Sequence, residues 1–253
     1  MNQTTKIILA NIAVAGCIAI VVVAKIIWFP TVQDAWFQTN GRQLRTVPNG
    51  LVIVRPTHFP HTPTNSVGYA NDNGKMRVAG RNVTFLYLMA MAYQYNPSRV
   101  SLPVGAPTNN FDFVVTGAQE KLRTVILKKT GYSAQIQTQD TDVLALKVAD
   151  PDSTALAPSG PDEKQNVNFK QGRLYFTHMK LKGIADGLQG VLKTPVVDET
   201  GLSNYYDFSL PWSRNMNPNN LTRDDLDKIV GAWGLQFVPD TASIEMLVVK
   251  KGD

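Results

Sequence analysis

The residues with the most obvious chemistry are two histidines, His58 and His61, which flank a Phe-Pro pair. Histidines three positions apart can share a metal ion on one face of a helix, but Pro60 lies between them and a proline interrupts a helix. Pro63 follows, and no third ligand lies nearby in the sequence. The pattern favours an exposed loop, so we predict neither a metal site nor a cofactor. His178 stands alone at the end of a predicted strand and is interpreted as an ordinary residue.

Paired carboxylates are the second candidate. Asp112 and Asp207 each lie between two aromatic residues, and two such carboxylates could act as general acid and base. Side chains alternate across a strand, so the pattern favours aromatic residues in the core and aspartates that face solvent. Asp198 and Glu199 precede another strand, but two acids alone rarely hold Ca²⁺, and a turn is favoured there. The sequence has no Gly-x-Ser-x-Gly motif and one cysteine, Cys17, so we predict no enzyme activity.

An apolar run from residue 7 to residue 29 is the feature least typical of a soluble protein. A helix of about 20 apolar residues crosses the hydrocarbon core of a bilayer. Asn11 lies near one end of the run and Lys25 near the other, where its long side chain can reach the headgroups. Trp28 and Trp36 are of the residue type that gathers at membrane interfaces. We therefore predict a single transmembrane helix that acts as a signal anchor, with Lys25, Trp28 and Trp36 as interfacial anchors.

Two alternatives remain open for this run. The residues up to Cys17 resemble the site at which bacterial lipoproteins are cut and acylated, although apolar residues follow where a polar tether is usual. Residues 22–24 would be a poor site for simple signal-peptide cleavage. The small residues Ala13, Gly16 and Cys17 permit close packing of another membrane helix, and Asn11 can hydrogen-bond across such a contact. We predict a partner face at these four positions, with a plain anchor as the alternative.

Charge and polarity bear on location and partners. The short polar amino terminus before the apolar run predicts a cytoplasmic N-terminus and a periplasmic main domain at a bacterial inner membrane. The formal net charge is +5, but the sequence has no block of Lys and Arg and no interleaving of Arg with aromatic residues. We therefore expect no nucleic-acid partner. The expected partners are the lipid bilayer and other integral membrane protein subunits.

The rest of the chain shows one order of predicted elements twice: strand, helix, strand, helix and hairpin. Phe111-Asp112-Phe113 matches Tyr206-Asp207-Phe208, and Gly131 matches Gly234. The predicted hairpins pair 132–138 with 142–148, and 235–238 with 243–249. The predicted fold class is α+β, with one N-terminal transmembrane helix and a soluble domain of two duplicated β-α-β-α-β-β units. The predicted domains are a signal-anchor helix over 1–30, a juxtamembrane linker over 31–50, a first α+β lobe over 51–150, a linker over 151–171 and a second α+β lobe over 172–253.

Four stretches carry a resemblance to a known family: Val52–Pro56, Ala79–Thr84, Phe111–Phe113 and Pro195–Phe208. Through them the chain resembles the membrane-anchored family of domain of unknown function 3738, which is common in Acidobacteria and other soil bacteria. The resemblance covers about residues 50–250 and implies the fold and the anchoring. It implies no reaction, because the family has no assigned activity.

Three functions follow as hypotheses. The first is a non-enzymatic accessory or structural subunit of a bacterial inner-membrane complex, such as a photosynthetic or respiratory supercomplex, braced through its membrane helix and a periplasmic domain. The alternative is an autonomous cell-envelope binding module for a peptide or a glycan. An uncharacterised hydrolase is the third and weakest hypothesis.

Overall fold

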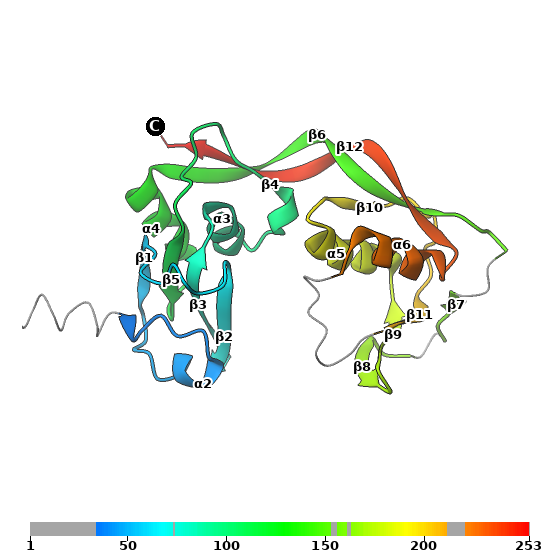
Figure 1. Ribbon diagram of the computed structural model, residues 1–253, viewed down its shortest axis with the longest axis horizontal. Helices are drawn as coiled ribbons and strands as arrows, with labels where there is room; N and C mark the ends of the chain where they lie inside the picture. The colour runs from blue at the N-terminus through cyan, green and yellow to red at the C-terminus, as the bar shows by residue number, and fades with distance from the viewer. Residues whose placement is uncertain (1–33, 73, 153–155, 161–162, 212–220, 253) are drawn as a thin grey trace, which may run out of the picture. The chain divides into compact units, whose positions relative to one another are not determined.

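The computed structural model describes residues 34–72, 74–152, 156–160, 163–211 and 221–252. These residues form two compact units, each of which is described by itself. The first unit contains the described residues up to 93, together with 103–133 and 250–252, and the second contains 94–102 and the described residues from 134 to 249. Three four-stranded sheets with short helices make up the described chain (Figure 1).

The first unit is built on an antiparallel sheet with the strand order β1-β5-β3-β2. All five residues of the central strand β5 are buried, because both faces of the sheet are covered. Val114 packs with Phe37 and Leu44 on one face. On the other face, the Phe111 ring lies 5.9 Å from the ring of Phe85. The strands are β1 (Val52–Pro56), β2 (Ser66–Asp72), β3 (Lys75–Val83) and β5 (Phe111–Val115).

Three helices of the first unit follow local sequence signals. They are α2 (Gly41–Leu44), α3 (Phe85–Tyr93) and α4 (Glu120–Thr130). The two helices predicted in the first of the two repeated orders of elements are present as α3 and α4. Gly131 ends α4 with φ 76°, a left-handed conformation that glycine adopts without steric cost. The Arg123 Nε atom of α4 donates a hydrogen bond of 3.0 Å to the Ala92 carbonyl of α3.

A buried carboxylate, Asp112, ties the middle of this sheet together. Its side chain is completely buried. It accepts hydrogen bonds from Thr57 Oγ1 at 2.7 Å, from the His58 amide at 2.8 Å and from the Asn82 amide at 3.1 Å. The Arg55 Nε atom lies 3.4 Å from Asp112 Oδ2. The interpretation of Asp112 as a solvent-facing residue is therefore wrong, because the face opposite its aromatic neighbours is also covered.

The second unit contains an antiparallel sheet with the order β7-β11-β9-β8. Two helices, α5 (Leu181–Leu192) and α6 (Arg223–Gly231), pack their apolar residues with this sheet into one core that includes Phe208 and Trp233. Thr222 and Asp225 bond each other's backbone at the start of α6 and form a capping box. The strands are β7 (Ala157–Pro158), β8 (Asn166–Lys170), β9 (Arg173–Met179) and β11 (Tyr206–Pro211).

A third sheet has the order β10-β6-β12-β4 and contains the two longest strands, each of 17 residues. Within the second unit, β10 runs parallel to β6 and β4 runs parallel to β12. Val143 packs with Ile244 and Met246 in a small cluster of its own. The strands are β4 (Val100–Ser101), β6 (Tyr132–Val148), β10 (Val196–Asp198) and β12 (Leu235–Lys251), and a 3₁₀ helix, η1 (Pro97–Arg99), precedes β4.

The predicted fold class is wrong, because no β-α-β-α-β-β unit occurs among the described residues. Each of the two predicted hairpins is one continuous strand, β6 or β12, and the short strands β4 and β10 interrupt the expected order. Between the paired ranges of the two predicted hairpins lie the Asp-Thr pairs Asp140-Thr141 and Asp240-Thr241. Tight two-residue turns favour Asn-Gly or Asp-Gly, because they need positive φ. An Asp-Thr pair lacks the glycine, so the alternating pattern continues as extended backbone. The fold is instead β-rich, with three sheets and few helices.

The membrane predictions also need correction. Among the described residues, no helix has both the length and the apolar character needed to cross a bilayer. This finding contradicts the predictions of a transmembrane helix, a signal anchor and an inner-membrane location with a periplasmic domain, and we do not retain them. The run over 7–29 lies outside the described residues. So do the proposed partner-face residues and two of the interfacial anchors, namely Asn11, Ala13, Gly16, Cys17, Lys25 and Trp28.

Replacing Asp112 with alanine is expected to lower the free energy of unfolding by about 3–5 kcal/mol, because the Thr57 hydroxyl and the amides of His58 and Asn82 lose their acceptor, and Arg55 keeps only Asp34 as a charged partner. Urea denaturation at pH 7, followed by circular dichroism, measures this loss. The matched control is Asp227→Ala, which removes a carboxylate that is 43% exposed and paired with Arg223. Such exposed pairs contribute about 1 kcal/mol or less. Equal losses in the two variants would contradict the structural role of Asp112.

Candidate functional site

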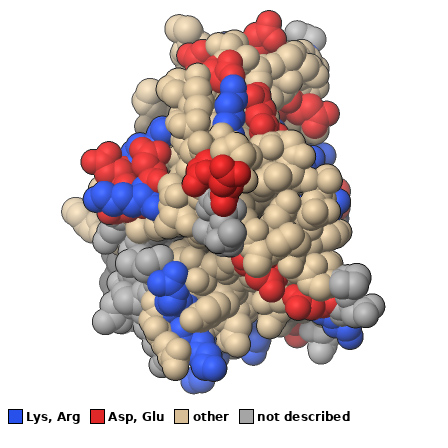
Figure 2. Space-filling model, turned by 90° about the vertical axis from the view of Figure 1, so that its right-hand side faces the viewer, with Lys and Arg blue, Asp and Glu red and all other residues tan. Residues whose placement is uncertain are grey.

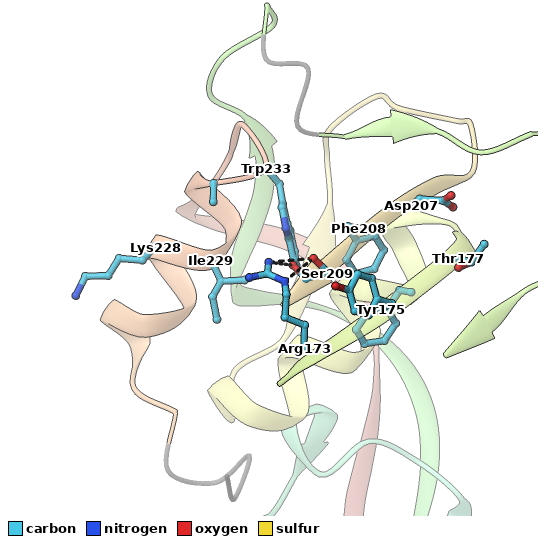
Figure 3. Close-up of a pocket in the computed structure, with 11 residues that line it drawn as sticks. Arg173, Tyr175, Thr177, Asp207, Phe208, Ser209, Lys228, Ile229 and Trp233 are labelled. Carbon is cyan, nitrogen blue, oxygen red and sulfur yellow. Dashed lines mark hydrogen bonds between the residues drawn. The ribbon is translucent and has the colours of Figure 1, made fainter. Parts of the chain in front are cut away.

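A cavity in the second unit has a volume of about 680 Å³. Its walls come from β9, β11 and α6 (Figure 3). Arg173, Tyr175 and Thr177, which alternate on one face of β9, line it together with Phe176 of the same strand. The cavity therefore combines a charged group, hydroxyl groups and aromatic rings within one unit.

Arg173 is fixed in place by its neighbour on β11. Its Nε and Nη2 atoms donate hydrogen bonds to Ser209 Oγ at 3.0 and 2.9 Å, and Nη2 also donates to the Ser209 carbonyl at 3.4 Å. The strand register places Ser209 opposite Tyr175. These bonds hold the guanidinium in one orientation, and its Nη1 atom has no hydrogen-bond partner assigned within the described chain. A planar guanidinium held in this way is suited to binding a carboxylate or phosphate.

Aromatic rings form the wall beneath Arg173. The rings of Phe176 and Phe208 are stacked with centroids 4.8 Å apart, and Phe208 meets the indole of Trp233 edge-on at 4.9 Å. Phe208 and Trp233 are buried, so they are held by the core. Tyr175 is 36% exposed and lies on the solvent side of this group. In Figure 3 the rings of Tyr175, Phe208 and Trp233 lie near Arg173. The rings thus form an apolar wall next to one cation.

The charged residues at the edge of the cavity differ in whether their side chains can contact a ligand. Lys228 lines the cavity from α6 and extends away from the aromatic rings (Figure 3). Because a lysine side chain is long and flexible, it can turn toward a ligand. Asp207 also lines the cavity, but it already accepts internal hydrogen bonds. On the face of the molecule shown in Figure 2, acidic and basic side chains are interspersed among uncharged ones. The positive groups of the cavity are thus a local feature.

Asp207 meets a serine and a histidine, the residue types of a hydrolytic triad. Ser159 Oγ and the His178 amide both donate to Asp207 Oδ1. A triad needs the histidine ring between the carboxylate and the hydroxyl. Here the ring of His178 instead stacks on Tyr205 with centroids 3.9 Å apart, and its Nδ1 atom is buried without a partner. The arrangement therefore orients backbone and does not activate Ser159.

The same contacts set the ionisation of Asp207. Burial raises its pKa, but the hydrogen bonds from Ser159 and from the His178 amide outweigh burial and hold the pKa below its ordinary value. Asp207 lies at an irregularity in the pairing of β9 and β11, where Thr177 and His178 together oppose it. His178 has φ 56°, a left-handed conformation that is uncommon for residues other than glycine. Asp207 thus stabilises the bend of β9 that ends the cavity wall.

The other residues singled out in the sequence do not form a site. His58 Nδ1 lies 3.2 Å from Asp34 Oδ1, and the described residues contain no group of three or more residues that could hold a metal ion. The turn predicted at Asp198 is confirmed, because its side chain accepts hydrogen bonds from the amide and the hydroxyl of Thr200. Trp36, proposed as an interfacial anchor, packs against the core cluster around Phe37.

Three glycines, Gly183, Gly187 and Gly190, lie in α5. A Cβ atom added to Gly187 or Gly190 would have no neighbour within 4 Å, and one added to Gly183 would meet only the Met179 side chain, at 4.0 Å. No described backbone therefore approaches these glycines closely. Sequence reasoning also missed the cavity. The available signal was the alternation of Arg173, Tyr175 and Thr177 on one strand face.

Comparison with known proteins identifies the family. A family model described as "Protein of unknown function (DUF3738)" matches residues 86–251, which include every residue of the cavity. The chain belongs to this family. The family resemblance predicted from the sequence is therefore confirmed, while its membrane-anchored, soil-bacterial character is not part of the match. No match was found among curated proteins or among solved structures.

Replacing Asp207 with asparagine is expected to destabilise the DUF3738 domain by about 1.5–3 kcal/mol at pH 7, because the charged acceptor is lost. A carboxylate whose pKa is lowered by folding adds stability above its unfolded pKa of about 3.9, and this contribution disappears as the pH falls through the folded pKa. The difference between the two proteins should be constant above about pH 5 and should shrink below about pH 4.

Urea denaturation from pH 2 to pH 7 measures this difference. Asp224→Asn, the same change at an exposed position in the first turn of α6, serves as the control and should cost less than about 1 kcal/mol. A difference between wild type and Asp207→Asn that grows as the pH falls below 4 would contradict the lowered pKa.

Proposed function

We propose that this chain is a non-enzymatic binding module whose second unit holds an acidic peptide in the cavity formed by β9, β11 and α6. The observation that carries the proposal is the guanidinium of Arg173, fixed by Ser209 next to the aromatic wall of Phe208 and Trp233. Binding sites of this kind are concave and mostly apolar, with a few well-placed polar groups that give specificity.

Binding is a better account of this geometry than catalysis. A nucleophile needs a general base within hydrogen-bond reach. The hydroxyl of Ser209 accepts hydrogen bonds from Arg173, a cation that cannot remove its proton. Ser159 is bound to Asp207, whose lowered pKa makes it a weak base. The described residues of the cavity thus hold and orient a ligand without a group poised to react.

The charge of the cavity favours an acidic ligand. Arg173 and Lys228 supply two positive charges, whereas the one carboxylate that lines the cavity, Asp207, already accepts two internal hydrogen bonds. A carboxylate of an acidic side chain can form paired hydrogen bonds with a guanidinium. The buried rings beside it exclude water, which strengthens such a contact. A peptide presents acidic and apolar side chains at short spacing, and this combination suits the cavity better than an uncharged glycan.

The accessory-subunit hypothesis has a different basis. It depended on the packing face of the apolar run over 7–29, which lies outside the described residues. Its membrane location is not carried into the proposal. The role as a subunit of a larger complex, and the absence of a nucleic-acid partner, remain predictions. Both agree with a module that binds a peptide segment of another protein.

The charge preference can be tested on a peptide array with acidic, neutral and basic sequences of equal length. The full chain is expected to retain the acidic peptides selectively, and Arg173→Gln should weaken binding of the best of them by about tenfold, or 1.4 kcal/mol. Isothermal titration calorimetry measures the change. Lys121→Gln, which removes an exposed charge from α4 in the other unit, is the matched control and should leave binding unchanged.

Two outcomes would contradict the proposal. One is retention of peptides without regard to their charge. The other is equal binding by wild type and Arg173→Gln, with both folded by circular dichroism. Selective retention of a neutral glycan in a parallel array would favour the glycan-binding alternative.

A further inference from the structure

A second cavity lies directly beside the first and has the opposite character. Its volume is about 200 Å³, and every residue that lines it is aliphatic, aromatic or glycine. It lies among β9, β11, α5 and α6. Four residues, namely Phe176, Phe208, Ile229 and Trp233, line both cavities. The two spaces are therefore neighbours across a shared aromatic wall.

The size and lining of this apolar cavity define what fits it. A cavity of about 150 Å³ lined by aliphatic and aromatic side chains stays dry and binds benzene. At about 200 Å³, this cavity is large enough for a benzene-sized group. It offers no carboxylate, amide or hydroxyl side chain to hold a bound water. An apolar group that enters it therefore displaces little ordered water and gains contacts with buried rings.

The open side of the apolar cavity lies at α5. Gly183 and Gly187 line the cavity, are exposed, and lie one helical turn apart. A Cβ atom at Gly187 would meet nothing within 4 Å, so the space in front of it is open. Gly190 on the same helix is also exposed but does not line the cavity. The pair Gly187 and Gly190 therefore offers a matched test position and control.

We infer that the apolar cavity receives a phenylalanine side chain of the acidic peptide whose carboxylate binds Arg173. The inference rests on the proposed function and specifies its ligand: a peptide in which phenylalanine stands next to glutamate or aspartate. We place the two side chains next to each other in the peptide because the two cavities share one wall. The positive charge on one side of that wall and the apolar lining on the other together select an acidic and aromatic pair over either residue alone.

Isothermal titration calorimetry with two unlabelled peptides, Glu-Glu-Phe-Glu-Glu and Glu-Glu-Ala-Glu-Glu, tests the inference on the full chain. The phenylalanine peptide is expected to bind about tenfold or more tightly, because burial of the ring removes apolar surface from water. In Gly187→Leu, which adds a large side chain to a residue that lines the cavity, this preference should fall to about twofold or less. Gly190→Leu, the same change outside the cavity, should keep the full preference.

The outcomes separate the proposed acidic-peptide site from the inferred preference for phenylalanine. If neither peptide binds, the proposed function is overturned. If both bind equally to the unaltered chain, the acidic site stands and the aromatic specificity is overturned. A preference that survives in folded Gly187→Leu would also overturn it. A direct measurement requires no variant: benzene alone should shift the NMR signals of the Trp233 indole in the unaltered protein, and unshifted signals would overturn the inference.

Discussion

The structure depends on two carboxylates that bind backbone amides where strands bend. Asp112 accepts from the amide of Asn82, and Asp207 accepts from the amide of His178. Both amides belong to residues with positive φ, 52° and 56°, at points where two residues of one strand oppose a single residue of the next. A left-handed conformation costs about 1–2 kcal/mol for residues other than glycine. A charged acceptor offsets this cost and satisfies an amide that the sheet leaves unpaired.

Each carboxylate fixes the elements around it. In the first unit, Asp112 joins β1, β3 and β5 and lies beside Arg55, whose guanidinium carbon lies 4.0 Å from the centroid of the Phe37 ring. In the second unit, the bend at Asp207 ends the regular pairing of β9 with β11. Between the start of β9 and that bend, the register brings Tyr175 opposite Ser209. The position of the Arg173 guanidinium thus follows from a backbone constraint several residues away.

The site joins charge and apolar surface in a way that suits recognition. The rings of Phe208 and Trp233 belong to the core of the second unit and also form the wall of both cavities. Residues that are held by core packing lose little conformational freedom when a ligand binds. The polar groups at the edge are few, and Arg173 is already oriented by Ser209. A preorganised wall and cation can therefore give affinity without a large conformational change.

Features set by neighbouring residues could be read from the sequence: the capping box of Thr222 and Asp225, the glycine that ends α4 and the family motifs. These depend on contacts within a few positions of the chain. Burial of Asp112 was not readable, because the residues that cover it, such as Thr57, lie 55 positions away. The cavity beside Arg173 was missed for the same reason. The continuous strands β6 and β12 were missed for a local reason, because their Asp-Thr pairs lack the glycine that a tight turn favours. Local sequence determined caps and helix ends, whereas contacts between distant segments decided which polar groups are buried and where a ligand can bind.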